Sequence, residues 1–353
     1  MSKFSILLPE VKNITINSIL KNPNETYKNV DLGYNKIIDD TKDKITKIDK
    51  NTWEKFKKHF NDYEFPVKYR YISRGFFKLQ EILVDYNLNI NCESLHLAES
   101  PGGFIEACIG YKNEKYSSIK TCHTMSKISP DSNIPNYHKK IINNSNVKIY
   151  KGITGDGDIY RLENIIYLMK NIKNVLFITA DGGIPVNEDF DIKEQIHYKL
   201  IYSQLLTIIL ILENNGSCVI KFFDSITELT VDMIYLMCFL FDKVYINKPY
   251  TSRTTNSEKY LVCLGYKKEL LNIQLKNYLV KIFDNIECYR SLFIKEPSFV
   301  EYIKKCNISI YKTQLKEIDK ILNAIEIGKQ IKLYNNSNNN KLIKSWISKY
   351  SSS

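Results

Sequence analysis

The chain has 353 residues, of which 44% are hydrophobic and 25% charged, and its 50 Lys and Arg against 39 Asp and Glu give a net charge of +11. That composition is ordinary for a globular protein and excludes wholesale disorder. The sequence has no run of about 18 apolar residues, so no transmembrane helix is expected. The apolar stretch near the N-terminus is too short for a signal peptide, so secretion is not expected either.

The basic residues and the cysteines both bear on the environment of the protein. Only five basic residues are Arg, and the 45 Lys, the 25 Tyr and the many Ile and Asn are typical of an AT-rich coding sequence. The net charge also favours a polyanionic partner, and composition alone does not separate the two explanations. The eight Cys show no CxxC spacing and no Cys/His cluster, which predicts reduced thiols in an intracellular protein and no structural zinc.

Short apolar runs alternate with amphipathic segments between residues 70 and 266. In chain order, helices are predicted at 71–86, 103–111, 159–171, 193–213 and 228–241, and strands at 94–97, 118–124, 147–150, 175–180, 218–222, 243–246 and 259–264. Gly216 is expected to end the helix at 193–213. This alternation predicts an α/β fold with a mostly parallel, doubly wound sheet. Only a polar loop joins the last two strands, so they are expected to form an antiparallel pair at one edge.

The chain divides into a patterned centre and less regular flanks. Residues 70–266 are expected to form the central domain, and residues 1–69 an N-terminal extension that packs on it. Residues 267–334 are predicted to form a helical C-terminal extension. The Asn-rich stretch at 335–340 opens what is expected to be a flexible basic tail over 335–353.

Five segments carry side chains suited to chemistry. The first, at 97–104, reads LAESPGGF and joins a predicted strand to a predicted helix. Its glycines allow the backbone to approach a ligand at the carboxyl edge of the sheet, although a tight turn without a ligand explains them equally well. The segment is not GxGxxG, which disfavours a dinucleotide. The second segment is the turn Asp181-Gly182-Gly183 at the end of the strand at 175–180.

The other three segments place charged side chains in unusual surroundings. Lys221 interrupts an apolar strand, and because burial of an ammonium group is costly, it is expected to pair with an acid or to take part in catalysis. The loop at 252–258, SRTTNSE, gathers hydroxyls, an amide, Arg253 and Glu258. In SRGFFKL at 73–79, Lys78 lies away from the apolar stripe of its helix, where a solvated side chain is the simpler explanation.

Together these segments resemble the FtsJ-like (RrmJ-like) ribose 2′-O-methyltransferases, which have a Rossmann-like fold. The family carries a Lys-Asp-Lys-Glu tetrad, which falls here on Lys78, Asp181, Lys221 and Glu258. The stretches GDGDI at 155–159 and NKPYTSR at 247–253 are similar to those of the eukaryotic and large-DNA-virus mRNA cap ribose methyltransferases. His96 stands where the bacterial enzymes have Asp, which weakens the interpretation as a bacterial rRNA enzyme.

The resemblance implies a cofactor site, an RNA-facing surface and no metal. The cofactor is S-adenosyl-L-methionine, and the residues implied in binding it are Ser73, Ala98, Glu99, Ser100, Pro101, Gly102, Gly103, Phe104, Asp156, Asp158, Ile159 and Asp181. The sequence leaves open which of the two acids in the GDGDI stretch contacts the cofactor. The residues implied in facing RNA are Arg74, Asp191, Lys193, Lys248, Arg253 and Asn256.

The tetrad suggests how a ribose hydroxyl becomes a nucleophile. The hydroxyl must lose its proton and lie in line with the methyl–sulfur bond. Lys221 is the best general-base candidate, and burial beside a second cation, Lys78, is expected to depress its pKa from about 10.4 to about 7–8. Asp181 would hold Lys221 and favour the sulfonium, and Glu258 would orient Lys78 or the ribose.

The leading hypothesis is an enzyme that methylates the first transcribed nucleotide of 5′-capped mRNA, with other capping or transcription proteins as further partners. The alternatives are a 2′-O-methyltransferase of rRNA or tRNA, and a catalytically idle methyltransferase-like RNA-binding or scaffold subunit. The complete tetrad argues against the idle subunit. Composition and site together suggest a large DNA virus or an AT-rich protist. The expected location is therefore intracellular, in the host cytoplasm (viral factory or virion) for a virus and otherwise in the nucleus or cytoplasm.

Overall fold

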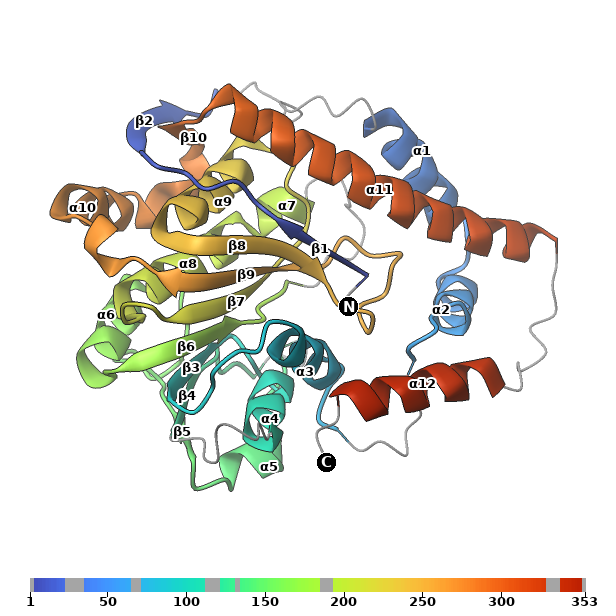
Figure 1. Ribbon diagram of the computed structural model, residues 1–353, viewed down its shortest axis with the longest axis horizontal. Helices are drawn as coiled ribbons and strands as arrows, with labels where there is room; N and C mark the ends of the chain where they lie inside the picture. Colours follow the sequence, from blue (N-terminus) through green and yellow to red (C-terminus); the bar gives the residue numbers. More distant parts are fainter. Residues whose placement is uncertain are drawn as a thin grey trace.

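An eight-stranded sheet forms the centre of the protein (Figure 1). The computed structural model describes residues 3–22, 35–64, 71–111, 121–130, 134–184, 193–327 and 337–350. In spatial order, the strands are β1 (Phe4–Leu7), β8 (Phe241–Lys248), β9 (Lys259–Tyr266), β7 (Ser217–Phe222), β6 (Val175–Ala180), β3 (Glu93–Leu97), β4 (Cys122–Met125) and β5 (Val147–Ile149).

The pairing of these strands confirms the mostly parallel sheet with an antiparallel edge. Strands β3 to β7 are parallel to one another, and β9 runs antiparallel to both β7 and β8. The prediction that the β8–β9 pair forms the edge of the sheet is wrong, because one further strand lies outside β8. Strand β1 pairs antiparallel with β8, from Phe4 opposite Lys248 to Leu7 opposite Tyr245, and it is the edge.

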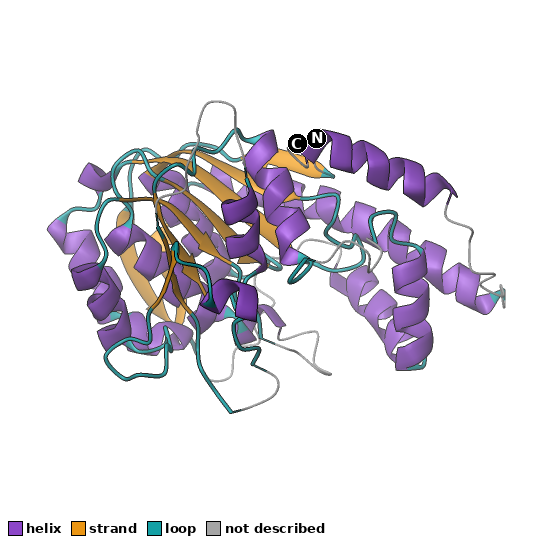
Figure 2. Cartoon of the chain, turned by 90° about the horizontal axis from the view of Figure 1, so that it is seen from below, coloured by secondary structure: helices purple, strands orange, loops and turns teal. Residues whose placement is uncertain are grey.

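Helices cover both faces of the sheet because successive strand residues point to opposite faces. On one face, Phe177 and Val219 pack against α3 (Gly75–Asp85) and α4 (Gly103–Gly110). On the other face, Ile178 and Ile220 pack against α6 (Leu162–Asn171), α8 (Tyr198–Ile211) and α9 (Glu228–Leu240). Figure 2 shows the strands of the sheet with helices on both sides.

Three of the predicted helices differ from the observed ones, and the one expected at 159–171 begins only at Leu162. The long helix expected at 193–213 is interrupted at His197 between α7 (Lys193–Ile196) and α8, and the Nε2 atom of His197 accepts a hydrogen bond from the amide of Ile184 at 3.1 Å. Helix α8 is capped by Leu212 rather than by Gly216, and the positive φ in the following turn (62°) belongs to Asn215. The helix expected at 71–86 begins only at Gly75.

The flanking segments are less uniform than expected. The expectation of an entirely helical 267–334 is wrong at β10 (Tyr289–Ile294), which pairs with β2 (Thr15–Leu20) in a second, two-stranded sheet. Around it lie the 3₁₀ segments Lys268–Leu270 and Phe283–Cys288, helix α10 (Ile273–Lys281) and the 30-residue helix α11 (Pro297–Glu326). Figure 1 shows α11 running away from the sheet toward α1 (Asn35–Thr46) and α2 (Lys50–His59).

The last described segment is ordered. The prediction of a flexible tail is wrong for residues 341–350, because α12 (Ser337–Tyr350) buries Trp346 and Tyr350 in the same apolar cluster as α3. The remaining short helix, α5 (Lys139–Ile142), packs near α4 through Ile141. Within the described ranges, no helix is long and apolar enough to span a bilayer.

Candidate active site

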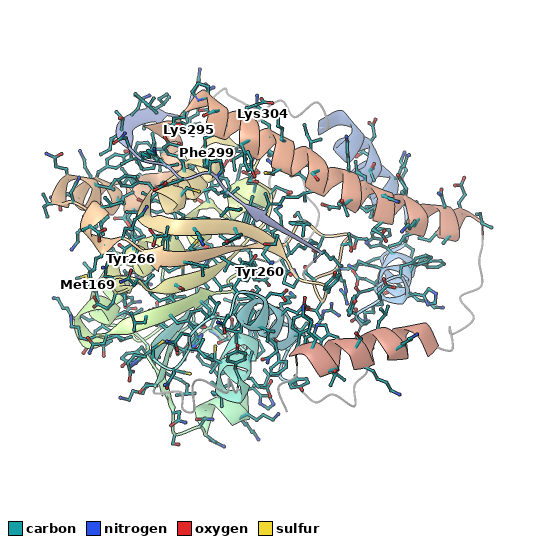
Figure 3. The ribbon with its side chains drawn as sticks, viewed as in Figure 1. Met169, Tyr260, Tyr266, Lys295, Phe299 and Lys304 are labelled. Atoms are coloured by element: carbon teal, nitrogen blue, oxygen red, sulfur yellow. The ribbon has the colours of Figure 1, made fainter. Side chains whose placement is uncertain are left out.

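The carboxyl ends of β6 and β7 bring two members of the predicted tetrad, Asp181 and Lys221, together. Lys221 lies near the end of β7, and its Nζ atom donates to the backbone carbonyl of Asp181 at 2.7 Å and lies 3.4 Å from the Oδ1 atom of the same residue. From the neighbouring β9, the hydroxyl of Tyr260, labelled in Figure 3, donates to Asp181 Oδ1 at 3.1 Å. The Asp181 carboxylate is therefore oriented by one cation and one phenol.

The other two tetrad members form a second ion pair. The Nζ atom of Lys78, on α3, lies 2.7 Å from Glu258 Oε1, and each side chain is only 12% exposed. The hydroxyl of Ser252 donates to the same Glu258 oxygen at 3.0 Å. The simpler explanation of Lys78 as a solvated side chain is wrong, because it turns toward the start of β9, where Glu258 lies. All four side chains thus meet at one end of the sheet.

The charges of this cluster act on one another. Burial lowers the pKa of Lys221, but the carboxylates of Asp181, Glu258 and Glu99 outweigh burial and raise the pKa above its ordinary value. The expectation that burial and Lys78 depress this pKa is therefore wrong for this arrangement. Burial also opposes ionisation of Glu258, yet Lys78 and Lys221 hold its pKa well below the usual range.

The turn between β3 and α4 is shaped by close packing within the protein. Gly102 has a φ of 115°, and a Cβ atom there would lie 2.5 Å from Ile141 Cγ1. A Cβ atom on Gly103 would lie 2.0 Å from Ser73 Oγ and 3.1 Å from the amide nitrogen of Phe76. Gly103 thus lets the turn press against Ser73 and the start of α3, and Gly102 lets it press against Ile141 of α5, so a ligand is not needed to explain either glycine.

This packing gives a test with an internal control. Gly103→Ala is expected to lower the free energy of unfolding by about 2 kcal/mol, because the added methyl overlaps Ser73. Gly110, at the other end of α4, has nothing within 4 Å of its Cβ position. Gly110→Ala is therefore expected to be neutral or stabilising by up to about 1 kcal/mol. Urea unfolding of both variants measures the difference, and equal stabilities would contradict the packing.

A buried carboxyl group and a serine complete the turn. The hydroxyl oxygen of Ser126 accepts hydrogen bonds from the amides of Glu99, at 2.7 Å, and Ser100, at 3.0 Å. Glu99 Oε1 accepts from the amide of Phe104, whereas Oε2 is buried and has no hydrogen-bond partner among the described residues. Burial and the nearby Asp181 raise the pKa of Glu99 well above its usual range. An unpartnered buried oxygen at this turn suits a ligand that carries an ammonium group.

Sequence reasoning missed Ser126, although a signal was available. Ser126 directly follows β4, whose carboxyl end lies beside that of β3 in a parallel sheet. A hydroxyl at that position is expected to reach the neighbouring turn.

The GDGDI loop separates the roles of its two acids. The carboxylate of Asp156 accepts from its own loop, including the amide of Asp158 at 3.0 Å and Arg161 Nε at 3.0 Å, and these donors lower its pKa to about 2 against the opposing effect of burial. Asp158 pairs with the exposed Lys127 at 2.9 Å. Asp158 Oδ1 also accepts from the amide of Tyr160 at 2.9 Å, so Asp156 orders the loop and Asp158 holds the end of the loop together with Lys127. Ile159 is buried beside it.

Two predicted RNA-facing arginines share one acid. Arg74 lies 2.6 Å from Glu64 Oε2 and also donates to the carbonyl of Thr251 at 2.7 Å. Arg253 donates to Glu64 Oε1 at 3.0 Å. Both guanidinium groups are half-buried, and one carboxylate neutralises only one of the two charges. Glu64 alone therefore does not neutralise both arginines, which lie on the side of the 252–258 loop.

The other predicted RNA-facing residues lie elsewhere. Lys248 is 2% exposed, and its Nζ atom donates to the carbonyl of Asn256, the side chain of Asn256 and the carbonyl of Glu258, at 2.9, 3.0 and 2.6 Å. The prediction that Lys248 faces RNA is therefore wrong. Its ammonium group is buried and holds the loop through hydrogen bonds to Asn256 and Glu258. Asp191 lies outside the described residues, and Lys193 is placed only as the first residue of α7.

The chain is similar in sequence to known methyltransferases. The FtsJ-like methyltransferase family matches residues 71–266. The cap-specific mRNA (nucleoside-2′-O-)-methyltransferase 1 of Leishmania braziliensis is 31% identical over 201 residues, which cover 53% of this chain and 50% of that protein. The protein of the same name from Homo sapiens is 32% identical over 186 residues, covering 48% of this chain and 22% of that protein.

The matched region is only part of each of these relatives. The chain spans half the length of the Leishmania protein and about a fifth of the human one. A solved structure of a ribosomal RNA methyltransferase from Plasmodium falciparum covers 56% of this chain and 98% of its own, with 18% identity and a TM-score of 0.41. Since the family match extends over more than half of the 353 residues, the chain belongs to the FtsJ-like methyltransferase family.

Proposed function

We propose that this protein transfers a methyl group from S-adenosylmethionine to a ribose 2′-hydroxyl of RNA, at the first transcribed nucleotide of capped mRNA. The observation that carries the proposal is the meeting of two ion pairs, Lys221–Asp181 and Lys78–Glu258, at the carboxyl edge of the sheet. The cap as target is supported by the names of the relatives, which are cap-specific mRNA methyltransferases.

The residues around the β3–α4 turn fit S-adenosylmethionine, the methyl donor of this family. Its amino-acid end carries an ammonium group, which the unpartnered Oε2 atom of Glu99 would accept. The turn at 98–104, with Ser73 and Asp158, would hold the rest of the cofactor. When bound, it supplies an electrophilic methyl group on a positively charged sulfur.

Lys221 is the group in the cluster best placed to take the proton of the ribose hydroxyl. It must first be neutral, whereas Asp181, Glu258 and Glu99 favour its charged form. A cation held beside those carboxylates would weaken their hold on Lys221 and lower its pKa. The enclosed site would then keep water from the neutral amine, while Glu258 holds Lys78 as a fixed positive charge nearby.

The pair of arginines supplies a reason for RNA to bind next to the tetrad. Arg74 and Arg253 share the single carboxylate of Glu64, so a phosphate oxygen would find an uncompensated guanidinium charge there. Contacts of this kind are sequence-tolerant and weaken as salt is raised. The amide of Asn256 would face the same side of the loop.

The test is methyl transfer from labelled S-adenosylmethionine to three RNAs of matched length. These are RNA with an unmethylated first ribose behind its cap, the same RNA without the cap, and structured ribosomal RNA. We expect transfer only to the capped RNA. Equal or greater transfer to the other two would contradict the cap assignment and favour an rRNA or tRNA enzyme. Binding of RNA without transfer to any of them would favour the scaffold.

A further inference from the structure

The C-terminal helix α12 lies outside the region that matches the family, yet it contacts the helix that carries Lys78 (Figure 1). The indole ring of Trp346 meets the ring of Phe77 edge-on, with 5.4 Å between the ring centroids. Trp346 is 4% exposed and Tyr350 is 2% exposed. This contact is therefore a packed interface between α12 and α3.

At the centre of the interface is a buried carboxylate, Glu81, one helical turn after Lys78 on α3. Its Oε1 atom accepts from Trp346 Nε1 at 3.0 Å, and from the amide and the hydroxyl of Thr251 at 2.9 and 2.6 Å. Its Oε2 atom accepts from the amide of Tyr250 at 2.7 Å. Burial raises the pKa of Glu81, and these four donors favour its ionised form. One side chain thus joins α3, α12 and the loop after β8.

The loop segment that Glu81 holds leads directly to the tetrad. Thr251 precedes Ser252, whose hydroxyl donates to Glu258 Oε1 at 3.0 Å. The same oxygen lies 2.7 Å from Lys78 Nζ. A chain of hydrogen bonds and one ion pair therefore runs from α12 through Glu81 and the loop to the Lys78–Glu258 pair, and Lys78 itself lies on α3.

We propose that α12 positions the Lys78–Glu258 pair, with Trp346 and Glu81 as the positioning residues that transmit its docking to the loop. The proposal rests on the proposed function, in which transfer depends on that ion pair. Neither residue touches the reacting atoms. Their effect on transfer comes from fixing residues 250–252, and through Ser252 the orientation of Glu258.

Other contacts allow the role of Trp346 to be isolated. The side-chain amide of Gln80 donates to the carbonyl of Tyr350 at 2.7 Å, and Lys349 Nζ donates to Asp85 Oδ1 at 2.9 Å. These two bonds anchor α12 on α3 without Glu81. Trp346→Phe therefore removes one donor to Glu81 while the helix keeps its other anchors. The matched control is Trp53→Phe, because Trp53 is the other of the two tryptophans in the chain. It lies in a separate apolar cluster between α2 and α11.

The experiment compares both variants in the full-length protein. Trp346→Phe is expected to lower kcat about tenfold, the loss that one hydrogen bond to a charged group produces, with an unchanged Kd for S-adenosylmethionine. Hydrogen exchange at the amides of Tyr250 and Thr251 is expected to speed up, with no change in β6. Trp53→Phe is expected to alter neither readout. An unchanged kcat in Trp346→Phe would overturn the proposal.

A double-mutant cycle separates positioning from general stability. Because both residues act on Glu258, Trp346→Phe is expected to reduce kcat much less in a Ser252→Ala background than in the wild type. Fully additive losses would overturn the proposal. If the wild-type protein transfers no methyl group to any RNA, the proposed function fails. The hydrogen-exchange measurement then decides the inference alone, and unchanged exchange at Tyr250 and Thr251 would overturn it.

Discussion

Lys221→Ala is expected to reduce methyl transfer to capped RNA by about 10³-fold, which is within the usual contribution of a general base. The amine lies at the centre of the cluster, 2.7 Å from the Asp181 carbonyl and 3.4 Å from its carboxylate. Its side chain is 13% exposed, so water has little access to replace it. The turn at 98–104 that would hold S-adenosylmethionine does not include Lys221, so cofactor binding is expected to survive.

Lys221→Arg is the control that separates charge from proton transfer. A guanidinium keeps the positive charge beside Asp181 but does not lose a proton in this pH range. We therefore expect Arg to restore the stability that Ala loses without restoring transfer. Turnover is measured with labelled cofactor, and cofactor affinity by calorimetry. Wild-type turnover in either variant would rule out Lys221 as the base.

The centre of the fold was predictable because local pattern and topology agree there. The strand at 175–180 is apolar except for Thr179 and is observed with those bounds. Asp181 follows it directly, and Lys221 lies near the end of the adjacent parallel strand. Since parallel strands present their carboxyl ends at one edge, the order of the motifs was enough to bring these side chains together. The pairing of Lys78 with Glu258 depends on how α3 packs against the sheet. Local pattern did not predict that packing, and only the resemblance to the family placed the two residues in one site.

What the sequence did not predict depends on contacts between distant segments. Strand β1 is only four residues long, and its identity as the sheet edge requires β8, more than 230 residues later. The amide of Lys3 donates to the carbonyl of Lys248 at 2.9 Å, so the edge that would have exposed Lys248 is covered. A lysine in a polar stretch gives no local sign of such burial.

The same reasoning explains the C-terminal helix. The Asn-rich stretch at 335–340 resembles a linker in composition, and composition carries no information about a distant docking site. Helix α12 is held in place by Trp346 and Tyr350. Their hydrogen-bond partners, Glu81 and Gln80, lie more than 260 residues earlier in the chain. The elements that were missed are therefore those whose stability comes from tertiary contacts and not from local propensity.

Asp181→Asn is expected to lower the free energy of unfolding at pH 7 by about 3 kcal/mol, the cost of leaving a largely buried ammonium without its partner. Asp181 is the largest influence that opposes the effect of burial on Lys221. With a neutral amide in place of Asp181, Glu258 and Glu99 are the carboxylates left to oppose the lowering of the Lys221 pKa by burial. The pKa of Lys221 is therefore expected to fall. Tyr260→Phe is the matched control, because it removes only the phenol donor to Asp181 and is expected to cost about 1 kcal/mol.

The pH dependence of this loss identifies its cause. In the wild type, the pKa of Lys221 is raised above its unfolded value, so its contribution to stability is fully present at neutral pH and is lost only as pH rises through the folded pKa. In Asp181→Asn the lower pKa means that Lys221 sheds its proton earlier. The difference in stability between the two proteins must therefore shrink as pH rises from 7 toward 10. Urea unfolding across that range measures it, and a difference independent of pH would show that the loss has a source other than the Lys221 charge.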